Sequence, residues 1–344
     1  MGLQGRDEMK HIEIRKQVIE YCSKIGLDPL LVQGAGGNVS WKDSDTLWIK
    51  ASGTRLALSK EEDIFTPVSL SNILYEVDNG NFHVQPMPEA PGALRPSIET
   101  LLHAILPWQV VAHLHAVNVL SVLVQSNAEE ILIALLGDEF NYVVVDYYKP
   151  GPLLAKAIFD KISGAPEVNV VFMKNHGLVV AADSVDELDQ LLNRLLKHFS
   201  FDSSCGHVAK VDKLKPKVGG YRQETTYDLD QLAINSRYLD IVKNFWVMYP
   251  DHVVFLGSEP VIFSTTSEFE NVISSGASPD IVFVEGVGVW VGEEMSSSKT
   301  EQLRCYYEVV IRLKEGSILR GLTRSEISEL INWDAEIYRI GLNK

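Results

Sequence analysis

The sequence predicts an α/β protein, because short apolar strands alternate with amphipathic helices along most of the chain. Apolar residues recur at helical spacing over residues 7–25, and Gly26 follows as a C-cap, which predicts a first helix there. Two apolar runs, 168–173 and 178–182, flank a short polar turn and predict adjacent strands. A length of 344 residues corresponds to about two domains, and a hydrophobic fraction of 46% provides for a substantial core.

The other elements of the first 200 residues follow the same alternation. Further strands are expected over 39–41, 47–50 and 110–117 and at the start of 141–151, and further helices over 97–106, 128–136, 152–162 and 183–200. Residues 59–91 have poor periodicity and are rich in Asp, Asn and Pro, so we expect a surface excursion there.

The second half of the chain predicts a smaller α/β unit. Lysines among Gly and Pro over residues 203–226 predict an exposed linker, which separates a domain at 1–202 from one at 227–344. In the latter we expect helices over 229–245, 267–274, 297–313 and 323–340, a strand over 252–256 and a glycine-punctuated hairpin over 280–293.

Composition excludes several classes of partner. A net charge of −15 argues against sequence-independent binding of nucleic acid and against binding to anionic membranes. No apolar run is long enough to span a bilayer, and the N-terminus lacks an apolar signal core. Cys22, Cys205 and Cys305 are odd in number and far apart, which indicates reduced thiols. We therefore expect a cytoplasmic protein.

Three histidines form a candidate metal site. His113 and His115 are spaced i, i+2 in a predicted strand, so both side chains emerge on one side. His176 lies in the turn between the strands 168–173 and 178–182 and could complete a set of three nitrogen ligands with an open coordination position. Taken alone, the pair also fits two ordinary half-buried histidines.

Glu99 follows Pro96 and Ser97, which mark the start of the helix expected over 97–106. A carboxylate in the first turn of a helix stabilises the helix dipole, and this is the simpler interpretation of Glu99. The functional interpretation is a general base, since a shielded carboxylate beside a metal can exchange a proton with a substrate carbon.

Two glycine-containing loops could bind an anion. The first is GAGGN, before the strand at 39–41, and the second is ASGT at residues 51–54. Taken alone, both are more simply interpreted as tight turns. No Lys-Ser/Thr follows the first loop and no GxGxxG opens a helix, so neither a P-loop nor an NAD-dependent activity is expected.

The motifs GGNVS, ASGT, PSIExxxH, AHLHA and KNHGLV occur in this order over residues 34–179 and together resemble the class II aldolase/adducin family. The resemblance implies a three-layer α/β/α domain with a central, mostly antiparallel sheet, and one zinc ion per chain. It implies His113, His115 and His176 as the metal ligands and Glu99 as the catalytic acid/base. The residues implied for substrate phosphate are Gly37, Asn38, Ser52, Gly53 and Ser97.

The implied reaction is retro-aldol cleavage of a ketose 1-phosphate to dihydroxyacetone phosphate and an aldehyde. The segments LRPSIETLLHA and PGPLLAKAI are similar to the aldolase half of bifunctional rhamnulose-1-phosphate aldolase/alcohol dehydrogenases. Ile98 stands where the family often has a second serine, which removes one hydroxyl from the phosphate site. Epimerisation or decarboxylation of a sugar phosphate at the same metal, or a non-catalytic adducin-like binding module, are the alternatives.

The resemblance also implies a homo-oligomer, commonly a tetramer. In family members a tyrosine from a neighbouring subunit supplies the acid near the aldehyde oxygen. Tyr142, Tyr147 and Tyr148 are candidates, and none of them matches a motif, so this role is unassigned.

Overall fold

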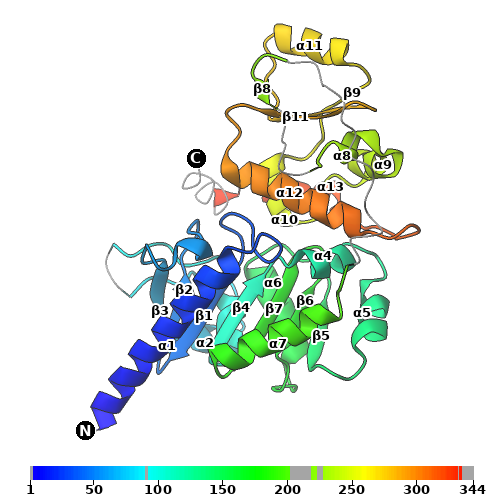
Figure 1. Ribbon diagram of the computed structural model, residues 1–344. Coiled ribbons are helices and arrows are strands. Elements are labelled where there is room, and N and C mark those ends of the chain that lie inside the picture. Colours follow the sequence, from blue (N-terminus) through cyan, green and yellow to red (C-terminus); the bar gives the residue numbers. More distant parts are fainter. Residues whose placement is uncertain (1–2, 90–91, 202–217, 223–227, 332, 335–344) are drawn as a thin grey trace.

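The computed structural model describes residues 3–89, 92–201, 218–222, 228–331 and 333–334. It contains two β-sheets, one built from the first half of the chain and one from the second (Figure 1). The part after residue 217 is called the C-terminal unit below. It lies across one end of the larger sheet, with α10 and α12 closest to that sheet (Figure 1).

The larger sheet has seven strands in the order β3-β2-β1-β4-β7-β6-β5. Neighbouring strands are antiparallel except β5 and β6, which are parallel, so the predicted mostly antiparallel sheet is confirmed. The strands are β1 (Asn38–Asp43), β2 (Thr46–Lys50), β3 (Phe65–Ser69), β4 (Val110–Leu114), β5 (Tyr142–Val145), β6 (Val170–Met173) and β7 (Gly177–Ala182).

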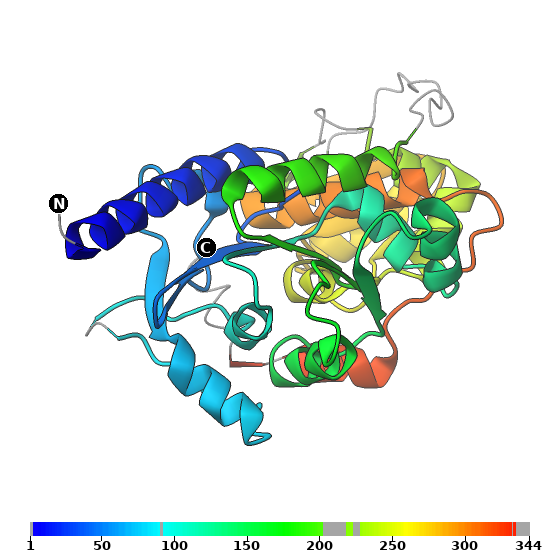
Figure 2. The same cartoon turned by 90° about the horizontal axis from the view of Figure 1, so that it is seen from below.

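Helices cover both faces of this sheet. Along β4, Val110, Ala112 and Leu114 pack toward α1 and α7, whereas Val111 packs toward α3 and α6. Viewed from below, the sheet lies between these two helix layers, which confirms the predicted three-layer arrangement (Figure 2). The helices are α1 (Leu3–Gly26), α2 (Leu70–Asp78), α3 (Thr100–Ile105), α4 (Val117–Leu123), α5 (Ala128–Leu136), α6 (Pro152–Ile162) and α7 (Val185–Lys197), with a short 3-10 helix at Leu56–Leu58.

The expectation for residues 59–91 was wrong, because this segment contributes β3 and α2. Val68 of β3 and Ile73 and Val77 of α2 are buried in a hydrophobic cluster against β2. The Ser69 side chain caps α2 by accepting a hydrogen bond from the Asn72 amide. The segment is therefore an integral edge of the sheet.

The C-terminal unit has a four-stranded sheet in the order β8-β11-β10-β9. Its strands are β8 (Tyr221–Arg222), β9 (Ile262–Phe263), β10 (Ile281–Val284) and β11 (Gly288–Gly292). Its helices are α8 (Gln231–Ile234), α9 (Ser236–Asn244), α10 (Pro250–Leu256), α11 (Thr266–Ser274), α12 (Ser297–Arg312) and α13 (Arg324–Leu330). This confirms a second, smaller α/β region.

Three expectations for this unit need correction. The strand predicted over 252–256 is helix α10, because Pro250 at its first position and Gly257 at its end delimit one short helical segment. The helix predicted over 229–245 is broken at Asn235, whose extended backbone ends α8 and whose side chain caps α9. Most of the predicted linker lies outside the described residues, but Tyr221–Arg222 within it form β8.

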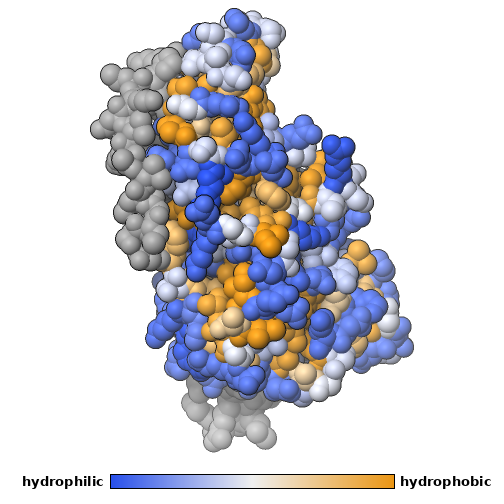
Figure 3. All heavy atoms as spheres, turned by 90° about the vertical axis from the view of Figure 1, so that its right-hand side faces the viewer, coloured by the Kyte–Doolittle hydropathy of each residue, from blue (hydrophilic) through white to orange (hydrophobic). Residues whose placement is uncertain are grey.

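A shared core joins the C-terminal unit to the larger sheet domain. Val117, Leu120 and Val124, in and just after α4, pack in one buried cluster with Met248 and Tyr249, which precede α10. On the face shown in Figure 3, hydrophobic side chains alternate with hydrophilic ones across both parts of the molecule. Within the described part of the chain, none of the helices combines the length and the apolar character required to cross a membrane.

Candidate active site

The register of the central strands brings the predicted site residues to one end of the sheet. Asn38 of β1 lies opposite His113 of β4, and His113 in turn lies opposite Val179 of β7. His115 follows the end of β4, and His176 lies in the turn that leads into β7. Residues that are far apart in the sequence therefore meet where three adjacent strands end.

Gly177 makes this close approach possible. A Cβ atom at this position would lie 2.5 Å from the Leu114 carbonyl oxygen and 3.1 Å from ring carbons of both His113 and His115. Any side chain would force the β6–β7 turn away from β4, so the glycine is required for His176 to reach the other two rings.

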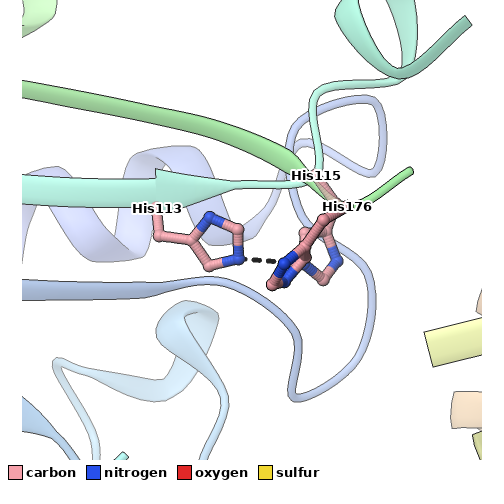
Figure 4. Close-up of side chains that lie close together, drawn as sticks. All are labelled: His113, His115 and His176. Atoms are coloured by element: carbon pink, nitrogen blue, oxygen red, sulfur yellow. Dashed lines mark hydrogen bonds between the residues drawn. The ribbon is translucent and has the colours of Figure 1, made fainter. Parts of the chain in front are cut away.

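The three imidazoles converge on one another, as Figure 4 shows. All three side chains are buried, and one ring nitrogen of each lies within 4.8 Å of the others. The Nε2 atoms of His113 and His115 are 3.1 Å apart. His113 Nδ1 lies 3.2 Å from the Leu178 carbonyl oxygen, and donation to that oxygen leaves the Nε2 lone pair directed at the centre of the cluster.

Glu99 completes this cluster from α3. Its carboxylate oxygens lie 3.5 Å from His113 Nε2 and 3.4 Å from His176 Nε2. Asn38 Nδ2 donates a hydrogen bond of 2.8 Å to Glu99 Oε2. Glu99 is the N-cap residue of α3 instead of a member of its first turn, because the preceding Pro96 pairs with Ala51 and keeps the chain extended.

The electrostatics of the site suit a cation. Burial lowers the pKa of His113 to about 4 and that of His176 to about 3, so both rings are neutral at neutral pH and retain a lone pair. Burial by itself raises the pKa of Glu99. At acidic pH, where His113 and His176 are protonated, their charges and the hydrogen bond from Asn38 outweigh this effect and hold that pKa below its usual value. The site therefore combines neutral nitrogen donors with one carboxylate.

These residues fit a divalent metal ion. Two nitrogens that share a tetrahedral zinc ion stand ~3.3 Å apart, close to the separation of the His113 and His115 Nε2 atoms. Within the described structure, Glu99 Oε1 is buried without a hydrogen-bond partner, as expected for an atom that awaits a cation. His113, His115, His176 and the Glu99 carboxylate could therefore hold such an ion.

Behind Glu99 lies a buried polar chain that the sequence motifs alone did not reveal. Ser40 Oγ lies 2.7 Å from His103 Nδ1, and His103 Nε2 contacts Asn38 Oδ1. Because the Asn38 amide group already donates to Glu99, its oxygen must accept from His103 Nε2, so the Ser40 hydroxyl donates to His103 Nδ1. This chain fixes the orientation of Asn38 and, through it, that of Glu99.

A pocket opens beside the cluster, and all five residues predicted to bind phosphate line it. Glu99, His115 and His176 contribute to its wall, whereas His113 is not among the lining residues. The lining residues with predicted roles are Gly37, Asn38, Ser52, Gly53, Ser97, Glu99, His115 and His176. The structure thus gathers the predicted phosphate residues next to the predicted metal residues.

Two charged residues of this pocket were missed by the sequence analysis. Lys50 is buried at the end of β2, and its ammonium group donates to the carbonyl oxygens of Ala35 and Thr54. Asp251 comes from α10 of the C-terminal unit and is also buried. The sequence signal for Lys50 was a lysine ending an apolar strand, whereas Asp251 had none.

None of the three tyrosines considered for the acid near the aldehyde oxygen is among the described residues that line the pocket. Tyr142 lies on β5, Tyr147 packs against the Arg320 guanidinium, and Tyr148 is exposed. The role therefore stays unassigned within the described chain.

Comparison with known proteins places this site in a family. Residues 16–195, just over half of the chain, match the Class II Aldolase and Adducin N-terminal domain family. The chain belongs to this family. The matched segment contains all the predicted site residues, so the resemblance drawn from the motifs is confirmed at the level of the family.

Two curated proteins and one solved structure illustrate the relationship. The chain is 24% identical to the uncharacterized oxidoreductase YuxG of Bacillus subtilis over 95% of its own length but only 58% of the length of that relative. It is 28% identical to an L-fuculose phosphate aldolase of Methanocaldococcus jannaschii, over 50% of this chain and 86% of the aldolase. The N-terminal class II aldolase domain of a Thermoplasma acidophilum protein is 27% identical, with a TM-score of 0.46 over 53% of this chain and 90% of that domain.

Proposed function

We propose that the protein is a zinc-dependent class II aldolase that cleaves a ketose 1-phosphate into dihydroxyacetone phosphate and an aldehyde. The observation that carries this proposal is the meeting of three buried imidazoles with the Glu99 carboxylate in a pocket lined by hydroxyl and amide groups. A set of three histidines leaves a coordination position open for substrate oxygen, as catalytic zinc sites do.

In this proposal each residue has a separate task. His113, His115 and His176 hold the metal, which when bound supplies a Lewis acid for charge that develops on substrate oxygen. A basic group near the aldehyde oxygen accepts the hydroxyl proton as the bond between two substrate carbons breaks. Glu99, which must first take up a proton, transfers that proton to the carbon that stays with the ketone. Asn38 holds Glu99 in place through its 2.8 Å hydrogen bond.

The phosphate would bind in the same pocket, beside the histidine cluster. Its ligands would be Gly37, Asn38, Ser52, Gly53 and Ser97, all of which line that space. Lys50 is the one lysine or arginine among the described lining residues, and its positive charge favours an anion there. A phosphorylated sugar therefore suits the pocket better than a neutral one.

A panel of ketose 1-phosphates with different aldehyde tails tests the reaction. Release of dihydroxyacetone phosphate, measured with a coupled reductase, supports the aldolase, provided that Glu99→Gln abolishes it. Formation of an isomeric pentose phosphate or of carbon dioxide would replace the aldolase by an epimerase or a decarboxylase. Failure of the purified protein to bind any metal would favour an adducin-like binding module.

We further propose that the protein acts in the cytoplasm as a homo-oligomer, with a tetramer as the candidate assembly. The described cysteines Cys22 and Cys305 are buried and free, which fits a reducing compartment, and Cys205 lies outside the described residues. A neighbouring subunit could supply the group near the aldehyde oxygen, which accepts the hydroxyl proton during cleavage. Light scattering of the purified protein tests for the homo-oligomer, and a strictly monomeric, active enzyme would exclude a group supplied by a neighbouring subunit.

A further inference from the structure

The C-terminal unit forms one wall of the pocket that contains the histidine cluster. Pro250 and Asp251, at the start of α10, line it together with His115 and His176. Asp251 is only 4% exposed, and such a buried carboxylate requires nearby partners to offset the loss of hydration. Its partners lie in both parts of the protein.

One of these partners is His115. Its Nε2 atom faces His113, and its Nδ1 atom lies 3.4 Å from Asp251 Oδ2. An imidazole that binds a metal through Nε2 carries its proton on Nδ1, so this proton points at the Asp251 carboxylate. The separation is slightly longer than an ordinary hydrogen bond and closes with a small side-chain movement.

A hydrogen bond and a neighbouring glycine define the position of the carboxylate. Gln302 of α12 donates a hydrogen bond of 3.2 Å to Asp251 Oδ2. On the other side, a Cβ atom at Gly36 would lie 3.0 Å from Asp251 Oδ2 and 3.2 Å from His115 Nδ1. The glycine loop thus leaves room for this one carboxylate beside this one imidazole.

The same unit also contacts the His176 turn and the first glycine loop. Asn175, which precedes His176, donates hydrogen bonds to the carbonyl oxygens of Met248 (2.8 Å) and Arg320 (2.7 Å). Glu301 of α12 accepts a hydrogen bond of 2.5 Å from the Gly34 amide. The C-terminal unit therefore contacts the first glycine loop and the His176 turn as well as His115, and is more than an appended module.

We infer that Asp251 is a positioning residue for His115, so that the C-terminal unit completes the metal site of the N-terminal domain. The inference rests on the proposed function to the extent that the three histidines hold a divalent ion. A carboxylate that accepts the second ring N–H of a metal-binding histidine fixes its tautomer and raises its basicity. Asp251 would do so from outside the segment that matches the aldolase family.

Zinc affinity of the full-length protein, measured by competition with a chromophoric chelator, tests this inference. Asp251→Ala should weaken zinc binding about 100-fold, and Asp251→Asn, which keeps the shape but loses the charge, roughly tenfold. The matched control is Asp240→Asn, the same change at an exposed position of α9, which should bind zinc like the wild type.

A second readout separates positioning from general destabilisation. The metal-free Asp251→Asn protein should melt like the metal-free wild type, and its cobalt-substituted form should show a shifted visible absorption band. If Asp251→Ala does not fold, the zinc affinity of Asp251→Asn alone tests the inference. Wild-type zinc affinity in both Asp251 variants, with affinity lost in His113→Ala, would overturn the inference and leave the proposed function intact. Absence of zinc binding in the wild type would instead overturn both.

Discussion

Replacing Asn175 by alanine should strongly destabilise the protein and release the turn that carries His176. The Asn175 side chain is fully buried, with donor contacts of 2.8 Å to the Met248 carbonyl and 2.7 Å to the Arg320 carbonyl. Its Oδ1 atom accepts a hydrogen bond of 3.0 Å from the Arg320 guanidinium. Its backbone has a φ of 54°, in the left-handed region that asparagine tolerates better than alanine.

The magnitude follows from these contacts. A neutral hydrogen bond contributes about 1 kcal/mol and one to a charged group about 2 kcal/mol. The left-handed backbone costs alanine about 1 kcal/mol more. Arg320 keeps its ion pair with Glu326 at 2.6 Å, so its charge stays satisfied. The two neutral hydrogen bonds, the one to Arg320 and the backbone conformation together predict that Asn175→Ala lowers the free energy of unfolding by about 5 kcal/mol.

Urea denaturation of the metal-free protein measures this loss. Asn175→Gly should lose less than Asn175→Ala, because glycine adopts the left-handed conformation without strain. Asn271→Ala, at an exposed position of α11, is the control and should change stability by less than about 0.5 kcal/mol. A free energy of unfolding of Asn175→Ala within about 1 kcal/mol of the wild-type value would refute the hydrogen bonds of the Asn175 side chain to Met248 and Arg320.

Three further variants test the geometry of the site. Gly177→Ala should lower the free energy of unfolding, measured by urea denaturation, by about 1–3 kcal/mol and weaken zinc binding, because its Cβ would meet the Leu114 carbonyl at 2.5 Å. Unchanged zinc affinity would contradict the close approach of the β6–β7 turn to β4. His103→Leu should lower the free energy of unfolding by about 1–3 kcal/mol and lower kcat without loss of metal, since it leaves the buried Asn38 oxygen without its hydrogen-bond donor. An unchanged kcat would show that His103 does not help to position Glu99. Glu99→Gln should retain zinc and lose turnover, and normal turnover would exclude Glu99 as the proton donor.

Most of the first domain could be predicted from sequence because its periodicity is local. The helices expected over 128–136 and 152–162 coincide with α5 and α6, whose apolar faces recur at helical spacing. The edge strand β3 was missed because Pro67 interrupts it, and proline within a run argues against a strand unless the strand lies at an edge. Edge position is a property of the sheet and cannot be seen in one segment.

The site residues likewise fall into those with a local sequence signal and those without one. His113 and His115 were placed together by an i, i+2 spacing in a strand expected over 110–117, although β4 ends at Leu114 and His115 follows it. His176 was placed by the turn between two apolar runs, and both are local signals. Asp251 was missed because the apolar run that follows it fits a strand as well as a short helix. Its proximity to His115 depends on how the C-terminal unit packs on the sheet, and no local pattern encodes that packing.

The metal content of the purified protein shows whether His113, His115 and His176 hold a divalent ion. Inductively coupled plasma mass spectrometry of protein loaded with zinc and then freed of excess metal should find about one zinc per chain in the wild type and Glu99→Gln. His113→Ala should contain almost none. A wild-type protein that retains no divalent metal, or a His113→Ala protein that retains as much as the wild type, would contradict the account.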